Sequence, residues 1–280
     1  MATRYGSRLH DNNQVSQWLN NKPLTLTPKD VQRSSSFTVT ADSTKDVKGA
    51  WTEIIASTSE DTNFIYLSLA GTAISGSNTG MLLDVGIGGA GSESVVISNV
   101  PCGWQPNIQQ MLLNFPLAIS AGSRISARCA SFIASDTVAV QFTTAVVTGF
   151  VGSTLIDTFG AVTTDSRGTN IPGDNTYVQF VASTSVQYRA IVMVPCLGAS
   201  TNVAVAAENS TYTLGIGASG SEIDVMTIPI RTETAEQINF AVGTRTSIYA
   251  PESPIAAGNR LAVKQSIGRT YRDAIIFGVV

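Results

Sequence analysis

Histidine is almost missing from this 280-residue sequence, and the single one, His10, stands near the start of the chain. A Ser-His-Asp triad or a Cys-His pair needs an imidazole beside its nucleophile, so the rest of the chain can build neither. The three cysteines, Cys102, Cys129 and Cys196, have neither the even number of a disulfide framework nor the C-x-x-C spacing of a zinc site. We expect buried thiols in a protein made in a reducing cytoplasm, and we predict no metal and no cofactor.

Charge is also sparse, because Asp, Glu, Lys and Arg make up 13% of the chain, about half the usual share. Residues 1–36 hold five basic and two acidic residues, a net +3, and the remainder holds 12 basic and 18 acidic residues, a net −6. An acidic body without clustered Lys, Arg and aromatic residues argues against nucleic-acid binding. The basic leader is either a contact for an acidic partner surface or a solvated terminus.

Long apolar runs are absent as well. No run of 18 uncharged apolar residues occurs, so we predict no membrane span. The first residues, 1–6, lack the apolar core of a signal peptide. Together with the thiols, this fits a protein made in the cytoplasm of the producing cell.

Glycine is plentiful, and two glycine-rich stretches, 86–93 and 215–222, are near copies 129 positions apart. Each matches G-x-G-x-x-G, which in a dinucleotide-binding turn follows a strand and opens a helix. Here the following residues, 94–98 and 223–228, are short, β-branched and without a helical stripe. We therefore predict two β-hairpins, in which glycine supplies the positive φ of a tight reversal.

The duplication extends beyond these turns. Five pairs of similar segments occur in the same order, at offsets of 123, 126, 129, 136 and 129. They are 39–43 with 162–166, 54–59 with 180–185, 86–93 with 215–222, 121–125 with 257–261, and 145–149 with 274–278. Ordered matches at similar offsets predict two copies of one domain with small loop insertions. We place an N-terminal arm at 1–36, copy one at 37–150, a linker at 151–159 and copy two at 160–280.

Each copy contains eight short segments with the composition of strands, separated by turn residues. In copy one they are 37–41, 51–56, 63–70, 81–87, 93–99, 112–119, 124–130 and 138–148; in copy two they are 161–164, 177–182, 188–194, 212–216, 222–229, 238–242, 259–265 and 272–280. This predicts an all-β fold of two tandem jelly-roll-like β-sandwiches, preceded by an extended N-terminal arm. Many segments are apolar on both faces, which implies a second cover from the sister copy or another subunit.

Carboxylates are the remaining candidates for catalysis, as in glycoside hydrolysis. Asp84 and Glu93 flank the first glycine turn, and Glu222 and Asp224 flank the second. Glu93 corresponds to Glu222, but Asp84 corresponds to Thr213, so the pair is not duplicated. A carboxylate beside serine in a hairpin more often accepts local backbone hydrogen bonds. We therefore predict that the chain is not an enzyme and assign no catalytic residue.

Arg124 and Arg260 are matched charges, each after a glycine turn and before an apolar segment. Either they form ion pairs with a neighbouring subunit, or they pin their own hairpin within the chain. We favour the second interpretation.

Contact residues are predicted in two places. The leader offers one aromatic anchor and four cations for docking on a partner: Trp18, Arg4, Arg8, Lys22 and Arg33. Trp18 either docks there or folds back on the body of the chain. The long loop 101–106 contains Trp104 and differs from its counterpart at 233–239, which predicts different contacts for the two copies.

The strings at 83–93, 96–100 and 116–128 resemble a domain common in tailed-phage virion proteins, and copy two keeps this pattern at 215–222 and 254–261. The resemblance covers the centres of both copies but not the leader. It implies a β-sandwich building block without a cofactor, of the kind seen in capsid decoration, head or neck fibres and tail-associated adhesins, commonly as homotrimers. It supplies no catalytic residues.

From these features we expect a virion protein made in the host cytoplasm, a non-enzymatic structural component that is either a capsid decoration protein or a head or neck fibre. Its arm would dock on capsid, portal, neck or tail proteins, and the chain would form a homo-oligomer, with a trimer favoured. The alternative is a receptor- or carbohydrate-binding module that uses Trp104 on a host-surface glycan. A third hypothesis is a depolymerising enzyme that uses Asp84 and Glu93.

Overall fold

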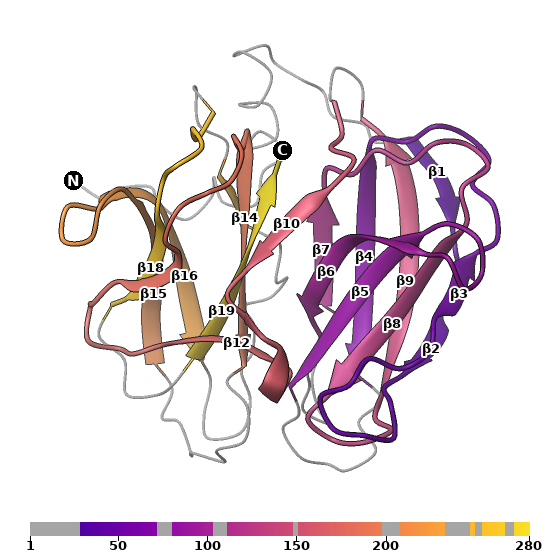
Figure 1. Ribbon diagram of the computed structural model, residues 1–280, viewed down its shortest axis with the longest axis horizontal. Helices are drawn as coiled ribbons and strands as arrows, with labels where there is room; N and C mark the ends of the chain where they lie inside the picture. Colours follow the sequence, from indigo (N-terminus) through magenta and orange to yellow (C-terminus); the bar gives the residue numbers. More distant parts are fainter. Residues whose placement is uncertain are drawn as a thin grey trace.

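The computed structural model describes residues 29–71, 80–102, 111–147, 151–197, 208–232, 247–249, 254–266 and 272–280. In these residues the chain forms nineteen β-strands and one 3₁₀ turn, η2 (Thr163–Asp165) (Figure 1). This confirms the predicted all-β fold of two tandem sandwiches. The described residues include no helix long and apolar enough to cross a membrane.

The first jelly roll packs two antiparallel sheets against each other. Its strands are β1 (Lys29–Arg33), β2 (Phe37–Thr40), β3 (Thr52–Ile55), β4 (Phe64–Gly71), β5 (Met81–Ile87), β6 (Ser94–Pro101), β7 (Met111–Phe115), β8 (Ile125–Ser131) and β9 (Thr137–Val146). One sheet has the order β9-β4-β7, with β1 and β2 both on the free edge of β9. The other has the order β3-β8-β5-β6, and the two together have the strand arrangement of a jelly roll.

The second jelly roll repeats this plan strand for strand. Its strands are β10 (Ile156–Phe159), β12 (Arg167–Ile171), β13 (Val178–Val181), β14 (Ala190–Leu197), β15 (Glu208–Ile216), β16 (Ile223–Thr232), β17 (Ser247–Tyr249), β18 (Leu261–Gln265) and β19 (Arg272–Val279), with β11 (Ala161–Val162) added beside β12. β10 and β12 pair with β19 as β1 and β2 pair with β9, and β19-β14-β17 corresponds to β9-β4-β7. The order β13-β18-β15-β16 corresponds to β3-β8-β5-β6.

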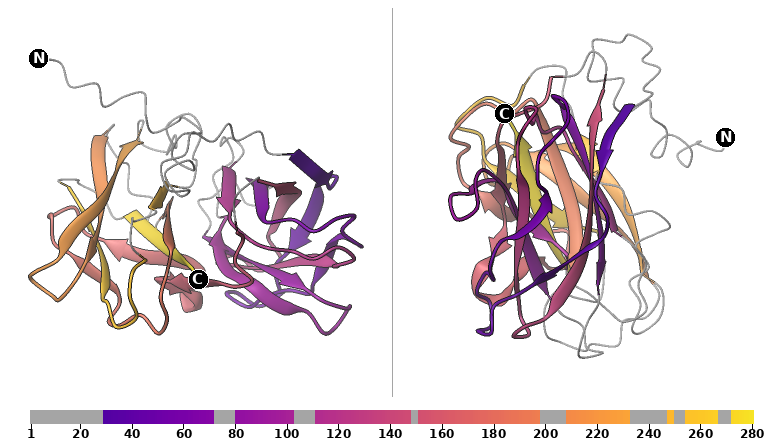
Figure 2. Two further views of the ribbon diagram at one scale, coloured as in Figure 1. Left: turned by 90° about the horizontal axis from the view of Figure 1, so that it is seen from above. Right: turned by 90° about the vertical axis from the view of Figure 1, so that its right-hand side faces the viewer.

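The two jelly rolls lie side by side and are joined by β10 (Figures 1 and 2). One edge of β10 pairs with β19 of its own jelly roll, and the other pairs in parallel with β6 of the first, at Ile156 opposite Ile97. The join turns one sheet from each jelly roll into a single ten-stranded sheet.

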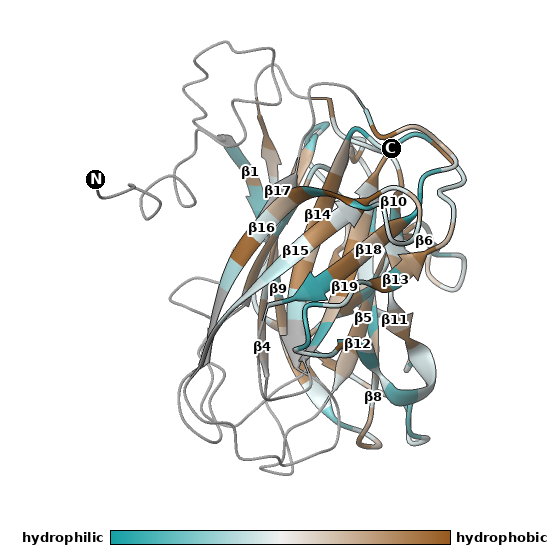
Figure 3. Cartoon of the chain, turned by 90° about the vertical axis from the view of Figure 1, so that its left-hand side faces the viewer, coloured by the Kyte–Doolittle hydropathy of each residue, from teal (hydrophilic) through white to brown (hydrophobic). Residues whose placement is uncertain are grey.

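Strands β14 and β19 are apolar on both faces, as the sequence predicted, and the sister copy supplies the second cover. Ile191 and Ile276 face the core of the second jelly roll, whereas Val192 and Phe277 belong to the core cluster of the first. The Phe277 ring meets the Phe115 ring edge to face, with centroids 5.2 Å apart. Figure 3 shows β14 as a largely apolar strand. The shared core and the shared sheet make the two jelly rolls one packed unit.

Two strands lie in segments that the sequence suggested were connections. β1 occupies the last part of the predicted arm 1–36, and β10 occupies the last part of the predicted linker 151–159. The predicted strand 161–164 is only β11 followed by η2, and β12 after it is the counterpart of β2. The predicted strand at 238–242 lies outside the described residues.

Candidate functional site

The two glycine stretches are hairpin turns, as predicted. The first connects β5 to β6 and the second connects β15 to β16, and both pairs are antiparallel. Gly88 and Gly217 have φ of 138° and 124°, and Gly91 and Gly220 both have φ of 80°. These values favour glycine, which explains the repeated spacing. A strand follows each turn, so neither has the helix N-terminus of a dinucleotide-binding turn.

An arginine pins each hairpin from within the same chain. Arg124 donates from Nε to Glu53 and from Nη1 to Glu93, both at 2.7 Å. Arg260 binds Glu222 through Nη1 and donates from Nε to Gln179 Oε1 at 3.0 Å. The hydrogen bond from Arg124 holds the pKa of Glu93 below its usual value. This confirms the intramolecular role that we favoured for both arginines.

An aromatic ring covers the glycine that precedes each turn. A Cβ at Gly86 would stand 2.6 Å from Trp51, and one at Gly215 would stand 2.5 Å from Tyr177. The Arg128 guanidinium lies 4.5 Å from the Trp51 ring centroid, and Lys264 Nζ lies 4.5 Å from that of Tyr177. Cations at this distance are attracted to the ring face. Glycine, ring and cation therefore belong to the repeated scaffold.

Among the described residues, a cluster like that around Asp84 occurs in the first jelly roll and not in the second. The Asp84 carboxylate, whose side chain is 5% exposed, accepts hydrogen bonds from Lys48 Nζ at 2.7 Å and Arg128 Nε at 3.1 Å. It also accepts one from the backbone N–H of Asn99 at 2.9 Å. Lys48 Nζ donates to the carbonyl of Leu82 as well, at 2.9 Å. Burial lowers the pKa of Lys48, and the Asp84 charge opposes that shift.

A β-bulge presents Asn99 to this carboxylate. Leu83 pairs with Val100 and Val85 with Ile97, so Asp84 stands opposite two residues of β6. Asn99 has φ of 56°, a left-handed conformation that asparagine tolerates better than most residues. The bulge turns its N–H toward Asp84.

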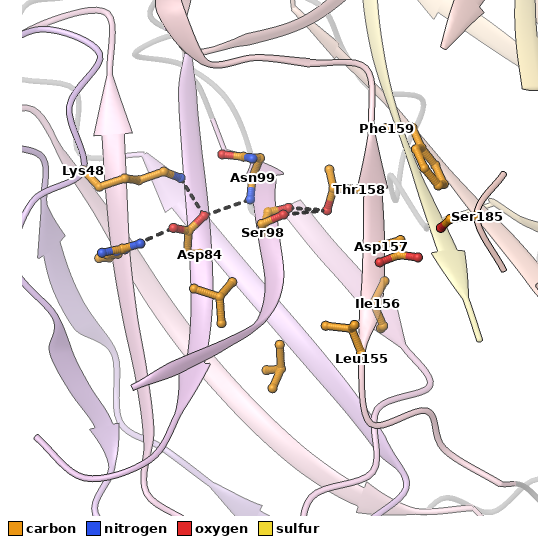
Figure 4. A pocket seen from close by; sticks show the side chains of 13 residues that line it. Lys48, Asp84, Ser98, Asn99, Leu155, Ile156, Asp157, Thr158, Phe159 and Ser185 are labelled. Atoms are coloured by element: carbon orange, nitrogen blue, oxygen red, sulfur yellow. Dashed lines mark hydrogen bonds and ion pairs between the residues drawn. The ribbon is translucent and has the colours of Figure 1, made fainter. Parts of the chain in front are cut away.

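These residues line one wall of a cleft of about 660 Å³ at the seam between the jelly rolls. Lys48 and Asp84 lie on one side, and Asp157, Thr158 and Phe159 of β10 lie opposite (Figure 4). Arg128, which is bound to Asp84, also lines the cleft. The hydroxyls of Ser98 and Thr158 form a hydrogen bond between β6 and β10 at 3.0 Å.

On the β10 side, Asp157 accepts a hydrogen bond from the hydroxyl of the buried Tyr188. Burial raises the pKa of Tyr188, and the hydrogen bond to Asp157 raises it further, so the phenol stays protonated.

A second buried carboxylate, Asp273, begins the apolar part of β19. It is fully buried and has Arg167 Nη1 at 3.5 Å and Asn170 Nδ2 at 3.4 Å. Burial, only partly offset by Arg167, raises the pKa of Asp273 to about 7. Arg167 is shared with Asp165, 2.5 Å from its Nε.

The structure places the predicted residues unevenly. Arg4, Arg8, Trp18, Lys22 and Trp104 lie outside the described residues. Arg33 lies on β1, exposed, and donates from Nε to Thr143 Oγ1 at 3.4 Å.

The carboxylates considered for catalysis have separate cations, since Asp84 is held by Lys48 and Arg128, and Glu93 by Arg124. Cys102 and Cys129 are buried free thiols, as predicted, and burial raises the pKa of Cys129 to about 12. No group of three His, Cys, Asp or Glu within the described residues could hold a metal ion.

The sequence drew attention to Asp84 and Arg124 but missed Lys48, Asn99 and Asp157. Lys48 is 36 positions from Asp84 along the chain, and the bulge at Asn99 breaks no obvious pattern. The absence of an acidic counterpart at Thr213 is the signal that identifies this site, because it marks a difference between otherwise matching copies.

No protein-family model and no curated protein matches this sequence. Among solved structures, a peptide-N(4)-(N-acetyl-β-D-glucosaminyl) asparagine amidase is similar at 8% identity, with 88% of this chain and 96% of that chain covered and a TM-score of 0.30. A recombinant peptide:N-glycanase F has 9% identity, coverage of 87% and 95%, and a TM-score of 0.32. The N-terminal CBM22-1–CBM22-2 tandem domain from Paenibacillus barcinonensis Xyn10C has 8% identity, coverage of 91% and 97%, and a TM-score of 0.27. Similarity at this level carries no argument about ligand or chemistry.

Proposed function

We propose that this chain is a non-enzymatic structural component of a tailed-phage particle, either a capsid decoration protein or a head or neck fibre. Its N-terminal arm docks on the particle, and its two fused jelly rolls project from the docking point. The phage assignment comes from the resemblance of the strings around the glycine turns. The docking role comes from the basic leader with its aromatic anchor, Trp18.

The observation that best supports a structural role is the seam. The parallel pairing of β10 with β6 and the packing of Phe277 against Phe115 join the jelly rolls through both a sheet and a core. Two domains linked in this way keep a fixed orientation, which suits a projecting element of an assembly. The arginines of both hairpins are also occupied within the chain, as expected of a self-contained block.

Truncation of the arm tests the docking role. The deletion should end at residue 28, because residues from 29 onward form β1, which pairs with β9. We expect the truncated chain to be soluble and to melt within a few degrees of the full chain, yet to be depleted at least tenfold from purified virions of a phage that encodes it. Quantitative mass spectrometry against the major capsid protein measures this.

Point variants test the positive charge of the leader and the aromatic ring of Trp18 separately. Arg4→Glu, Arg8→Glu and Lys22→Glu together reverse the charge of the leader, and Trp18→Ala removes its ring. Either set should reduce incorporation without changing the melting temperature. Normal incorporation of the truncated chain would show that the arm is not the docking element.

The competing role, a receptor- or carbohydrate-binding module, was attached to Trp104, which lies outside the described residues. The seam cleft, whose described lining does not include Trp104, is another candidate place for such binding.

A further inference from the structure

The cleft at the seam has the dimensions of a ligand site. Its volume is about 660 Å³, within the range of roughly 300–1,000 Å³ that is usual for small-molecule sites. Its walls come from different jelly rolls, β5–β6 on one side and β10 on the other (Figure 4). Because the shared sheet fixes these walls, the cleft is formed before any ligand binds.

The charged wall is not a requirement of the fold, and the second jelly roll demonstrates this. At the position equivalent to Asp84 it has Thr213, whose hydroxyl lies 3.0 Å from that of Thr227. The β15–β16 ladder runs through this pair without a bulge. The same strand arrangement therefore forms with a neutral pair at this position, whereas the first copy buries a carboxylate against two cations. Departures from the locally favoured solution tend to occur at functional sites.

The cluster leaves hydrogen-bond donors directed at the cleft. Lys48 uses two of its three N–H groups on Asp84 and Leu82. Arg128 uses Nε on Asp84, and its terminal N–H groups have no hydrogen-bond partner among the described residues. The Arg128 side chain is 32% exposed, so these donors reach solvent.

An acceptor lies within the same space. Asp157 gives one oxygen to Tyr188, and its other oxygen has no partner among the described residues. The apolar side chains of Leu155, Val96 and Phe159 also line the cleft.

From this arrangement we propose that the seam cleft binds a neutral oligosaccharide. Two cations and two carboxylates balance, so the lining favours a ligand without net charge. A sugar hydroxyl accepts from Lys48 or Arg128 and donates to Asp157, as paired donors and acceptors require. The C–H faces of sugar rings pack on apolar surface, which Leu155 offers with 46% of its area exposed.

The site goes beyond the proposed particle role. Its described lining does not include Trp104, the residue to which the sequence attached glycan binding. Since binding is measured on the purified full-length chain, its failure and a failure of particle docking are separate results.

The first test fills the cleft. The full-length chain is screened on an array of neutral oligosaccharides, and the strongest binder is titrated by calorimetry. Ser185→Trp places a large ring at the mouth, where Ser185 is exposed. The matched control is Ser59→Trp, at the equivalent exposed position of the first copy, which does not line the cleft. We expect affinity to fall at least tenfold for Ser185→Trp and to change less than twofold for Ser59→Trp.

A second pair of variants guards against misfolding of the first. Leu155→Ser removes apolar surface from the lining, and Val151→Ser does the same outside it, at a side chain that is 71% exposed. We expect at least a threefold loss of affinity for Leu155→Ser only. Three results would overturn the proposal: no neutral oligosaccharide bound at millimolar concentration, binding unchanged by both cleft variants, or binding restricted to acidic saccharides. Normal incorporation of Ser185→Trp into virions would separate this site from docking.

Discussion

Among single residues, Asp84 and Lys48 are held at a cost to stability. Moving two charges out of water costs several kcal/mol per ion, and their attraction recovers that cost only with good geometry and further hydrogen bonds. Asp84 has such bonds from Arg128 and Asn99, and Lys48 has one to Leu82. Thr213 in the second copy avoids the problem with a neutral partner. The first copy therefore buries an ion pair at a cost to its stability, although the fold does not require one.

Removing one charge of the Asp84–Lys48 pair should therefore lower the free energy of unfolding more than removing both. Asp84→Asn leaves Lys48 beside a neutral amide, and we expect it to lower the free energy of unfolding by about 3 kcal/mol. Asp84→Thr combined with Lys48→Met copies the neutral solution of the second jelly roll, and we expect it to lie within about 1 kcal/mol of the parent. Urea unfolding measures both. If the double variant is as unstable as the single one, the cluster is a structural need of this copy.

Asp273 predicts a pH dependence of stability. Its pKa is about 7 in the folded chain, against about 3.9 for an unfolded aspartate. Between these values the folded chain binds more protons, so the contribution of Asp273 to the free energy of unfolding falls as pH rises from about 4 to about 7 and is level above that.

Asp273→Asn, which stays neutral, should remove this fall. We expect the variant to exceed the parent by about 1 kcal/mol at pH 4.5 and by about 4 kcal/mol at pH 8. Urea unfolding at pH 4.5, 6 and 8 measures the difference, and parallel profiles for the two chains would contradict the assignment.

At the scale of strands and turns, the glycine hairpins could be predicted because their glycines adopt a conformation that few other residues share. Three of the five repeat matches also agree with the structure: 54–59 with 180–185, 86–93 with 215–222, and 121–125 with 257–261. Gly122 and Gly258, for example, have φ of 78° and 88° and donate to the equivalent carbonyls of Thr58 and Thr184. Because the turns require glycine at fixed positions, these segments can be aligned in one register.

The two outer matches have the wrong register. The sequence aligned 145–149 with 274–278, but Ala145 stands opposite Phe64 as Val279 stands opposite Ala190, so Ala145 corresponds to Val279. By the same pairing Val39 corresponds to Ile171 rather than to Val162. Runs of small and β-branched residues fit a strand equally well after a shift of several positions, and only the neighbouring strand decides.

The missed strands β1 and β10 have a related cause. β1 reads Lys-Asp-Val-Gln-Arg and β10 reads Ile-Asp-Thr-Phe, which are short and partly polar. Their strand conformation comes from hydrogen bonds to β9 and β19, which lie far along the chain. The seam cleft depends on β10, so the local sequence pattern could not predict where the cleft lies. The pattern did point to Asp84, which lines it.

For the whole molecule, the seam changes the argument for oligomerisation. The doubly apolar strands suggested a cover from the sister copy or from another subunit, and β14 and β19 receive theirs from the sister copy. These faces therefore no longer call for a second chain. The predicted trimer rests on the resemblance to virion proteins alone, and mass measurement of the purified chain remains its test.

The same seam predicts that the two jelly rolls unfold together. The three tryptophans, Trp18, Trp51 and Trp104, all precede the second jelly roll, so their fluorescence reports on the first half of the chain, while far-ultraviolet circular dichroism reports on both. Because Phe277 of the second half is fully buried in the core of the first, we expect the two signals to coincide in urea.

Phe277→Ala should cost about 3–5 kcal/mol and shift the tryptophan transition together with the dichroism. Ile223→Ala, at a side chain that is 71% exposed on β16, is the matched control, and we expect it to stay within about 0.5 kcal/mol. Separate transitions, or a tryptophan signal that ignores Phe277→Ala, would mean that the jelly rolls are independent and that the cleft between them is not held fixed. A single shared transition would mean that the core that joins the jelly rolls couples the stability of both walls of the cleft.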